Sequence, residues 1–510
     1  MTRAEIAQRR QAYGGSIAVA VIGAIALLAA CVWRKRLRLR HVFLFVGYYI
    51  LVGWAIWFIV DIGLDEETCG PDAGTVAIKG GLEDYGFGRD KNLVVIDLTD
   101  IGGVRDIDAD DKKPATMQTW VNGTLNTTYH IGVEIKGRLD YLQYKVGLSI
   151  ETWDADGEDM DTTFTEFGFE REYEDYVLRR EREGKEFVKD GALFRAQPQF
   201  YEHTMVEVVY LVGNEYTYEG VFYFVNNPAK KDSIPGATKF KPSKTPCEES
   251  TYIIEYEYKA NKPGNLSGYP RLELKYPKQS KLEAAPECKA WLEALLTFQN
   301  ASQLNWPSLA DGFVLHQCML GADMQGRSMI SHVQDGQLRS GPAWDCEQRL
   351  IGIGSGKMSE WILYDDSARR DWWQTWLTRY TTEFQDAIRS STMATTYNAA
   401  FVSTDALLRS QVASGYFKRE EERFPCVKML PLLDYERRWH DKRTDWVMSH
   451  VGSFTASDVV YIQSFWVVAI HWLIAGVSIF GFGVLVEAWH CACARKRASA
   501  RHMWVLSVSV

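Results

Sequence analysis

Residues 205–225, MVEVVYLVGNEYTYEGVFYFV, carry the clearest strand signal in the chain. Met205–Leu211 and Tyr216–Val225 are both rich in β-branched and aromatic residues, and they flank Gly213-Asn214. Two such runs separated by a glycine-asparagine pair are typical of a β-hairpin, because this turn needs backbone conformations that glycine and asparagine adopt most easily. This stretch therefore predicts two long antiparallel strands.

Strand patterns surround this hairpin, and helical patterns follow it. Further strands are expected at 93–96, 132–136, 146–150, 252–256 and 271–276. From Cys288 the apolar residues recur every three or four positions, and after a short hairpin at 329–343 this spacing continues over 366–451. A strand-rich front half followed by a helical back half predicts an α+β domain of two lobes.

Composition excludes several classes of protein. The 510 residues include 18 Trp, 25 Tyr and 23 Phe, which are enough to build a large core and exclude disorder as the main state. The net charge of −9 argues against a nucleic-acid-binding protein, since such proteins present a basic surface. The sequence has no repeat of 20 to 50 residues, which disfavours solenoids and propellers.

Three apolar runs have the length of transmembrane helices, at 16–33, 42–63 and 465–486. A secretory signal peptide is the alternative for the first run. Basic residues at 34–40 and 495–501 are expected on the cytosolic side, which places residues 64–462 in a lumen or outside the cell. We therefore expect an integral protein of an endomembrane or the plasma membrane.

The glycosylation sequons and the number of cysteines agree with a luminal or extracellular location of residues 64–462. The four glycosylation sequons begin at Asn122, Asn126, Asn265 and Asn300. The six cysteines of this region are Cys69, Cys247, Cys288, Cys318, Cys346 and Cys426. An even number suits disulfide formation in an oxidising compartment, although the pairing does not follow from the sequence. Cys491 and Cys493 suit either S-acylation or free thiols.

Common catalytic and metal-binding motifs are missing from the sequence. The acidic stretch 154–161 lacks the glycine and glutamate spacing of an EF-hand and is interpreted as a solvated loop. The chain contains no His-Glu-x-x-His, Gly-x-Ser-x-Gly or Cys-x-x-Cys motif. Zinc hydrolases, serine hydrolases and thioredoxin-like enzymes are therefore unsupported.

One set of charged residues suits phosphoryl transfer. Lys145 precedes a predicted strand, Asp323 follows a predicted helix, and Asp345 ends Gly341-Pro-Ala-Trp-Asp345. Phosphoryl transfer needs a cation for the nucleotide phosphates, a carboxylate for Mg²⁺ and a second carboxylate for the attacking hydroxyl. Mg²⁺ is held by one or two carboxylates together with substrate phosphates, so no large ligand cluster is required.

Several segments resemble the CotH kinase family, named for a spore-coat protein kinase. The similar segments are 94–97 (VVID), 136–138 (KGR) with Lys145, 175–178 (DYVL), Asp190 with Leu193 and Arg195, 218–223 (YEGVFY), 253–255 (IIE) and 341–345 (GPAWD). The Pro-x-Trp-Asp segment is the most specific of these. The resemblance covers about residues 92–451 and implies an atypical protein-kinase-like domain with a strand-rich and a helical lobe.

The resemblance also implies roles for individual residues. Asp323 would be the catalytic aspartate, Lys145 and Arg138 would contact ATP, and Asp345 with Glu347 would hold Mg²⁺ or Mn²⁺. Three features depart from the family pattern: Glu347 stands where the family has aspartate, Gly321 where it often has asparagine, and Asn226 and Asn227 where it normally has glutamate.

Together these features predict a membrane-anchored kinase that phosphorylates Ser or Thr hydroxyls of secretory or surface proteins. The alternative is a catalytically degenerate surface protein that acts in adhesion or as a scaffold. The expected organisation is a membrane hairpin at 1–63, a linker at 64–91, the kinase domain at 92–451, a membrane helix at 465–486 and a basic cytosolic tail at 487–510.

Overall fold

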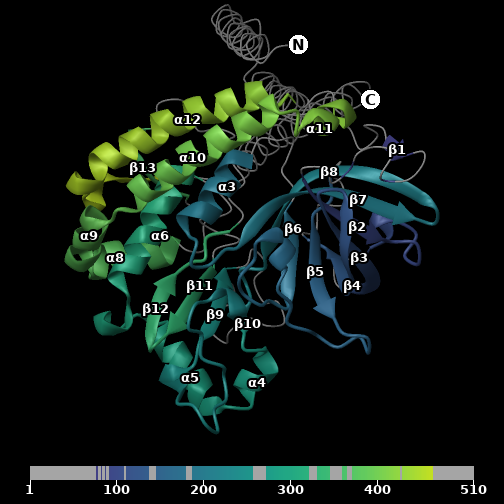
Figure 1. Cartoon of the computed structure of the whole chain (residues 1–510). Helices are drawn as coiled ribbons and strands as arrows, with labels where there is room; N and C mark the ends of the chain where they lie inside the picture. The colour runs from purple at the N-terminus through teal and green to yellow at the C-terminus, as the bar shows by residue number, and fades with distance from the viewer. Residues whose placement is uncertain are drawn as a thin grey trace, which may run out of the picture. The chain divides into compact units, whose positions relative to one another are not determined.

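In a computed structural model of the chain, the described residues are 76–78, 82, 87, 91–107, 111–136, 145–179, 187–256, 272–320, 330–344, 359–364, 370–424 and 428–462. They all fall within one structural unit, Cys69–Ile462. Figure 1 shows a barrel of strands on the right and the helices α10 and α12 on the left.

The front half of this unit is a closed barrel of seven strands. The strands are β2 (Asn92–Asp97), β3 (Lys113–Val121), β4 (Thr124–Ile135), β5 (Leu148–Trp153), β6 (Asp175–Arg179), β7 (His203–Val212) and β8 (Glu215–Asn226). Their order is β8-β6-β5-β4-β3-β2-β7, and the β7–β8 hairpin closes the ring. All neighbours are antiparallel except β2 and β7. The short strand β1 (Val76–Ile78) pairs with β8 outside the ring.

Apolar side chains that point inward from alternate positions of the strands fill the barrel. Val94 and Ile96 face one core cluster with Phe222 and Phe224, whereas their neighbours in sequence face other clusters. Because successive side chains of a strand point to opposite faces, one set lies inside the ring. The segment after β5 adds Phe164, which packs edge-on against Tyr176 with ring centroids 4.6 Å apart. The barrel is therefore a filled core and not an open channel.

Helices and two small sheets form the back half. The helices are α3 (Phe187–Ala196), α4 (Gln279–Glu283), α5 (Pro286–Leu295), α6 (Trp306–Met319), α8 (Arg370–Arg379), α9 (Thr381–Ser390), α10 (Met393–Ala413), α11 (Lys418–Arg423) and α12 (Met429–His450). The sheets are β10-β9-β11-β12 (Leu272–Tyr276, Tyr252–Tyr256, Ile330–Gln334, Gln337–Ser340) and the parallel pair β13–β14 (Trp361–Tyr364, Val459–Ile462). The outward side chains Val221, Tyr223 and Val225 of β8 belong to the core of this half.

Two of the six cysteines from the predicted luminal region are joined. Cys247, just before β9, forms a disulfide with Cys288 of α5, which closes a segment of 41 residues. Cys318 of α6 is a buried free thiol, and burial raises its pKa to about 12. Cys69, Cys346 and Cys426 lie outside the described residues.

The predicted hairpin is present, but the predicted fold is wrong. β7 and β8 turn at Gly213-Asn214, as the sequence indicates. The front half, however, is a closed barrel and not the strand-rich lobe of a two-lobe protein-kinase-like domain with three membrane helices. Closure depends on the parallel pairing of β2 with β7, in which Asn92 lies beside Val206. Local alternation predicts strands without showing such a distant pairing.

The prediction of an integral membrane protein is corrected as well. Within the described ranges, the structure has no helix with both the length and the apolar character needed to cross a membrane. The runs 16–33, 42–63 and 465–486, on which the prediction was based, lie outside these ranges. Hydropathy windows measure composition alone, so they predict a membrane span without testing the helix itself.

Candidate functional site

Of the predicted site residues, the structure describes Lys145. Arg138, Asp323, Asp345 and Glu347 lie outside the described residues. The assembly of these five residues into one site therefore stays a prediction. The structure does describe the surroundings of Lys145 and of Trp344, the residue before Asp345.

Lys145 is enclosed by protein groups just before strand β5. Its side chain is only 1% exposed, and its Nζ lies 2.9 Å from Oε1 of Glu420 in helix α11. Nζ also donates a hydrogen bond to the carbonyl oxygen of Val221 in β8. The ring of Phe222 lies 4.6 Å away and that of Phe187 lies 5.5 Å away. The ammonium group is thus paired with a carboxylate and hydrogen-bonded to the backbone, as a buried charge requires.

Glu420 joins the barrel to helix α11 through both of its carboxylate oxygens. While Oε1 binds Lys145, Oε2 accepts a hydrogen bond of 2.9 Å from the backbone N–H of Val221. Gly220, the preceding residue, has a φ of +126°, and a Cβ at this position would lie 2.4 Å from Oε2. Glycine is therefore needed here both for the backbone conformation and for the approach of the carboxylate.

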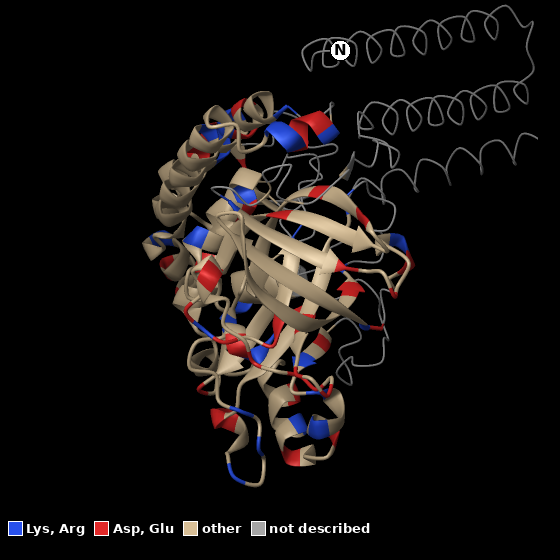
Figure 2. Ribbon diagram, turned by 45° about the vertical axis from the view of Figure 1, so that its right-hand side comes forward, with Lys and Arg blue, Asp and Glu red and all other residues tan. Residues whose placement is uncertain are grey.

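Further ion pairs fix α11 to the barrel. Arg423 binds Glu219 of β8 at 3.0 Å, and Arg419 binds Glu207 of β7 at 3.1 Å. Burial raises the pKa of Glu219, and the adjacent Arg423 opposes that shift. Figure 2 shows α11 as a short helix made up entirely of charged residues. The short, strongly charged helix is thereby attached to the barrel mainly by complementary charges.

Three segments that carry the CotH resemblance meet beside Trp344. Arg179, at the end of β6, directly follows the DYVL segment, and its Nε donates to Oδ2 of Asp190 at 2.9 Å. The guanidinium of Arg179 lies 5.1 Å from the centre of the Trp344 ring. Segments from β6, from α3 and from the Pro-x-Trp-Asp region thus form one contact cluster.

The residue before Trp344 is also held on both sides. The backbone N–H of Ala343 donates to Oε1 of Gln197 at 3.0 Å, and the carbonyl of Ala343 accepts from the Tyr201 hydroxyl. The Trp344 ring stacks near Phe194 and Tyr201, with centroids 6.3 and 6.4 Å away. The chain is therefore firmly positioned up to the residue before Asp345.

Among the described residues, one group of carboxylates is close enough to share a cation. Ligand oxygens of Asp161, Glu174 and Asp232 lie within 4.8 Å of one another. Burial, followed by repulsion from Asp232 and Asp161, raises the pKa of Glu174. Asp161 is exposed, and Asp232 also forms an ion pair with Lys231. Such acidic groups are common without an ion, so the solvated-loop interpretation of 154–161 stands.

Glu420 is the residue near Lys145 that sequence reasoning missed. It lies in the run KREEER, which has the composition of a solvent-exposed helix. The sequence nevertheless held a signal, because the aromatic residues Phe417 and Phe424 stand three residues before and four residues after Glu420. Both are buried in the structure. Residues with this spacing share one face of a helix, which places Glu420 on the buried side.

The chain matches no protein-family model, and a search of curated proteins gives no significant match. The resemblance to the CotH kinase family therefore depends on the segments quoted above and stays a prediction.

Proposed function

We propose that the protein is a CotH-like phosphotransferase that uses ATP and a divalent cation to phosphorylate Ser or Thr hydroxyls of a protein substrate. A particular fold is not a requirement of this chemistry, because function depends on the site and not on the scaffold. What phosphoryl transfer needs is the positioning of phosphates, metal and hydroxyl by a few charged groups.

The cluster around Trp344 carries this proposal. Arg179, Asp190 and Trp344 come from separate parts of the chain, yet they form one buried ion pair covered by one aromatic ring. Each of them belongs to, or directly follows, a segment quoted for the resemblance. Tight packing around Ala343 and Trp344 supports a role for the next residue, because a metal ligand must be held in place by its surroundings.

ATP and Mg²⁺ would be held by residues already named from the sequence. Asp345 and Glu347 follow the fixed Trp344 and have the carboxylate oxygens that Mg²⁺ prefers. Lys145 has the glutamate partner that the phosphate-binding lysine of protein kinases also has. Bound ATP would supply the γ-phosphoryl group, while Asp323 would accept the proton of the attacking hydroxyl.

A second function is favoured by the enclosure of Lys145. Its side chain is 1% exposed, and its ammonium group already faces Glu420, the Val221 carbonyl and the Phe222 ring. A lysine in these surroundings stabilises the attachment of α11 to the barrel without contacting any ligand. This observation supports a protein that keeps the scaffold but lacks catalysis and acts through binding.

Incubation of the full chain with labelled ATP and Mg²⁺ or Mn²⁺ separates the two functions. We expect label on the protein itself or on added acidic protein substrates, and we expect Asp345→Asn to abolish its transfer. Asp335→Asn is the matched control, because Asp335 lies in the β11–β12 turn with its side chain 73% exposed. Transfer by Asp345→Asn at the wild-type rate contradicts the assigned site. Absence of nucleotide binding by the wild type favours the non-catalytic protein.

A further inference from the structure

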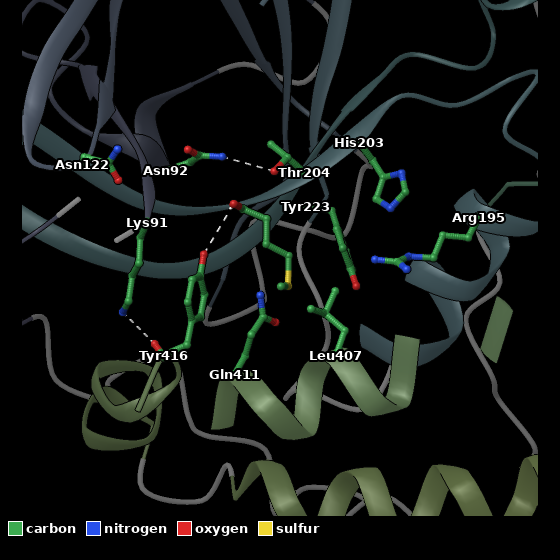
Figure 3. Close-up of a pocket in the computed structure, with 11 residues that line it drawn as sticks. Lys91, Asn92, Asn122, Arg195, His203, Thr204, Tyr223, Leu407, Gln411 and Tyr416 are labelled. Carbon is green, nitrogen blue, oxygen red and sulfur yellow. Dashed lines mark hydrogen bonds between the residues drawn. The ribbon is translucent and has the colours of Figure 1, made fainter. Parts of the chain in front are cut away.

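A pocket of about 300 Å³ lies outside the residues assigned to phosphoryl transfer. Strands β7 and β8 and the residues before and within β2 form one wall, and helices α3 and α10 form the other. Figure 3 shows Arg195 extending from α3 toward Tyr223, with His203 above it and Leu407 and Gln411 below. The volume is at the lower end of the range for small-molecule sites.

Two cationic side chains line the pocket, and they differ in their partners. Lys91 at one end is neutralised by Glu207, with its Nζ 3.1 Å from Oε1, and it also donates to the carbonyl of Tyr416 at 2.8 Å. Arg195 at the other end is exposed, and within the described part of the chain its guanidinium makes no ion pair or hydrogen bond. The pocket therefore offers one positive charge to a ligand.

His203 adds a polar group without a further charge. Its ring packs against those of Phe194 and Tyr223, with centroids 5.1 and 5.8 Å away. Burial, together with the nearby positive charge of Arg195, lowers the pKa of His203 to about 4. At neutral pH the imidazole is uncharged.

Gln411 lines the same space and has an unsatisfied acceptor. Its Oε1 is buried and, within the described ranges, lacks a hydrogen-bond partner. An unpaired buried carbonyl loses its hydrogen bonds to water without compensation, which is unfavourable. A ligand with an N–H or O–H donor would remove that cost. The remaining wall includes the apolar side chains of Met205 and Leu407 and the rings of Tyr223 and Tyr416.

We propose that this pocket binds a small carboxylic acid with a ring or other apolar body and a hydroxyl or amino group. The carboxylate pairs with the planar fork of Arg195, which matches its two oxygens. The donor group binds Gln411 Oε1, and the apolar body lies between the tyrosine rings. A doubly charged phosphate suits the pocket less well, because Lys91 is already neutralised by Glu207.

Titration of the full chain with 4-hydroxyphenylacetate, followed by NMR, tests the proposal. This probe has a carboxylate, a ring and a hydroxyl donor. Its methyl ester lacks the charge, and phenylacetate lacks the hydroxyl group. We expect the complete probe to bind at least about tenfold more tightly than either analogue, because hydrogen bonds to charged groups and to buried acceptors contribute on this scale. Absence of binding at millimolar concentration, or tighter binding of inorganic phosphate, overturns the proposal.

Two variants assign the contacts. Arg195→Gln is expected to weaken binding of the complete probe at least about tenfold and to leave the methyl ester unaffected. Gln411→Leu is expected to remove the advantage of the complete probe over phenylacetate. Arg438→Gln is the matched control, because Arg438 is an exposed arginine of α12 that does not line the pocket. Equal affinity of wild type and Arg195→Gln for the complete probe shows that the pocket is not a carboxylate site.

Discussion

Lys145 and Arg195 are two cations close to strand β8, and the protein surrounds them in opposite ways. Lys145 is enclosed, with Glu420 and the Val221 carbonyl as partners. Arg195 is exposed beside a pocket and has no partner in the described part of the chain. The first arrangement stabilises the fold but closes the ammonium group of Lys145 off from a ligand. The second leaves binding capacity for a ligand, so the two sites should respond differently to substitution.

The largest effect is expected for Glu420→Gln. This change removes the carboxylate charge and leaves the ammonium group of Lys145 buried without a counter-charge. Breaking a buried ion pair from one side destabilises a protein by about 3–5 kcal/mol. Urea denaturation measures the change in the free energy of unfolding.

Two comparisons make that experiment specific. Glu422→Gln changes the same residue type in the same helix, but the side chain of Glu422 is 63% exposed, so we expect it to be nearly neutral. Lys145→Met combined with Glu420→Gln removes both charges and should recover part of the lost stability. A Glu420→Gln protein as stable as the wild type would show that Lys145 has access to water, contrary to the enclosure described above.

A smaller loss is expected for Gly220→Ala. The φ of +126° at this residue disfavours any other amino acid, and the new Cβ would lie 2.4 Å from Glu420 Oε2. Strain of this kind costs about 1–3 kcal/mol. Gly415→Ala is the control, because Gly415 has a φ of +80° but no atom within 4 Å of an added Cβ. If thermal denaturation gives the same loss for both variants, the contact with Glu420 adds nothing to the backbone strain.

Arg195→Gln should barely change stability, in contrast to both previous variants. Exposed residues without partners affect the free energy of unfolding by no more than about 0.5 kcal/mol. Thermal denaturation of this variant beside Arg438→Gln measures the difference. A loss comparable to that of Glu420→Gln would mean that Arg195 is structural, which would remove the distinction between the two sites.

Much of the local structure followed from the sequence, and the long-range arrangement did not. The turn at Gly213-Asn214 was predictable because its chemistry depends on two adjacent residues. The closed barrel was not, because its ring depends on Asn92 pairing with Val206. Strand patterns are identical for an open and a closed sheet until such a distant pair is known.

The same distinction applies to the candidate site. Lys145 was identified from its position before a strand, but its partner Glu420 lies 275 residues further along the chain. Arg195 and Gln411 share a pocket although they belong to α3 and α10, and neither stands in a pattern that predicts the other. Charge and type of residue are local information, whereas the choice of partner is a property of the folded chain.

The smallest effect is expected at His203, and it tests whether Arg195 acts on the pocket through its charge. Burial is the main cause of the low pKa of about 4, and Arg195 is the second cause. Arg195→Gln removes the second cause alone, so the pKa of His203 should rise above about 4 and stay below the ordinary 6.5. Because the folded protein favours the neutral imidazole, stability is fully present above pH 6.5 and is lost as pH falls toward 4. The variant should therefore lose less stability on acidification than the wild type.

An NMR titration of the imidazole proton measures the pKa, with Arg438→Gln as the control that should leave it unchanged. An unchanged or lower pKa in Arg195→Gln would show that the guanidinium does not face His203, and the carboxylate-binding role of the pocket would lose its cation.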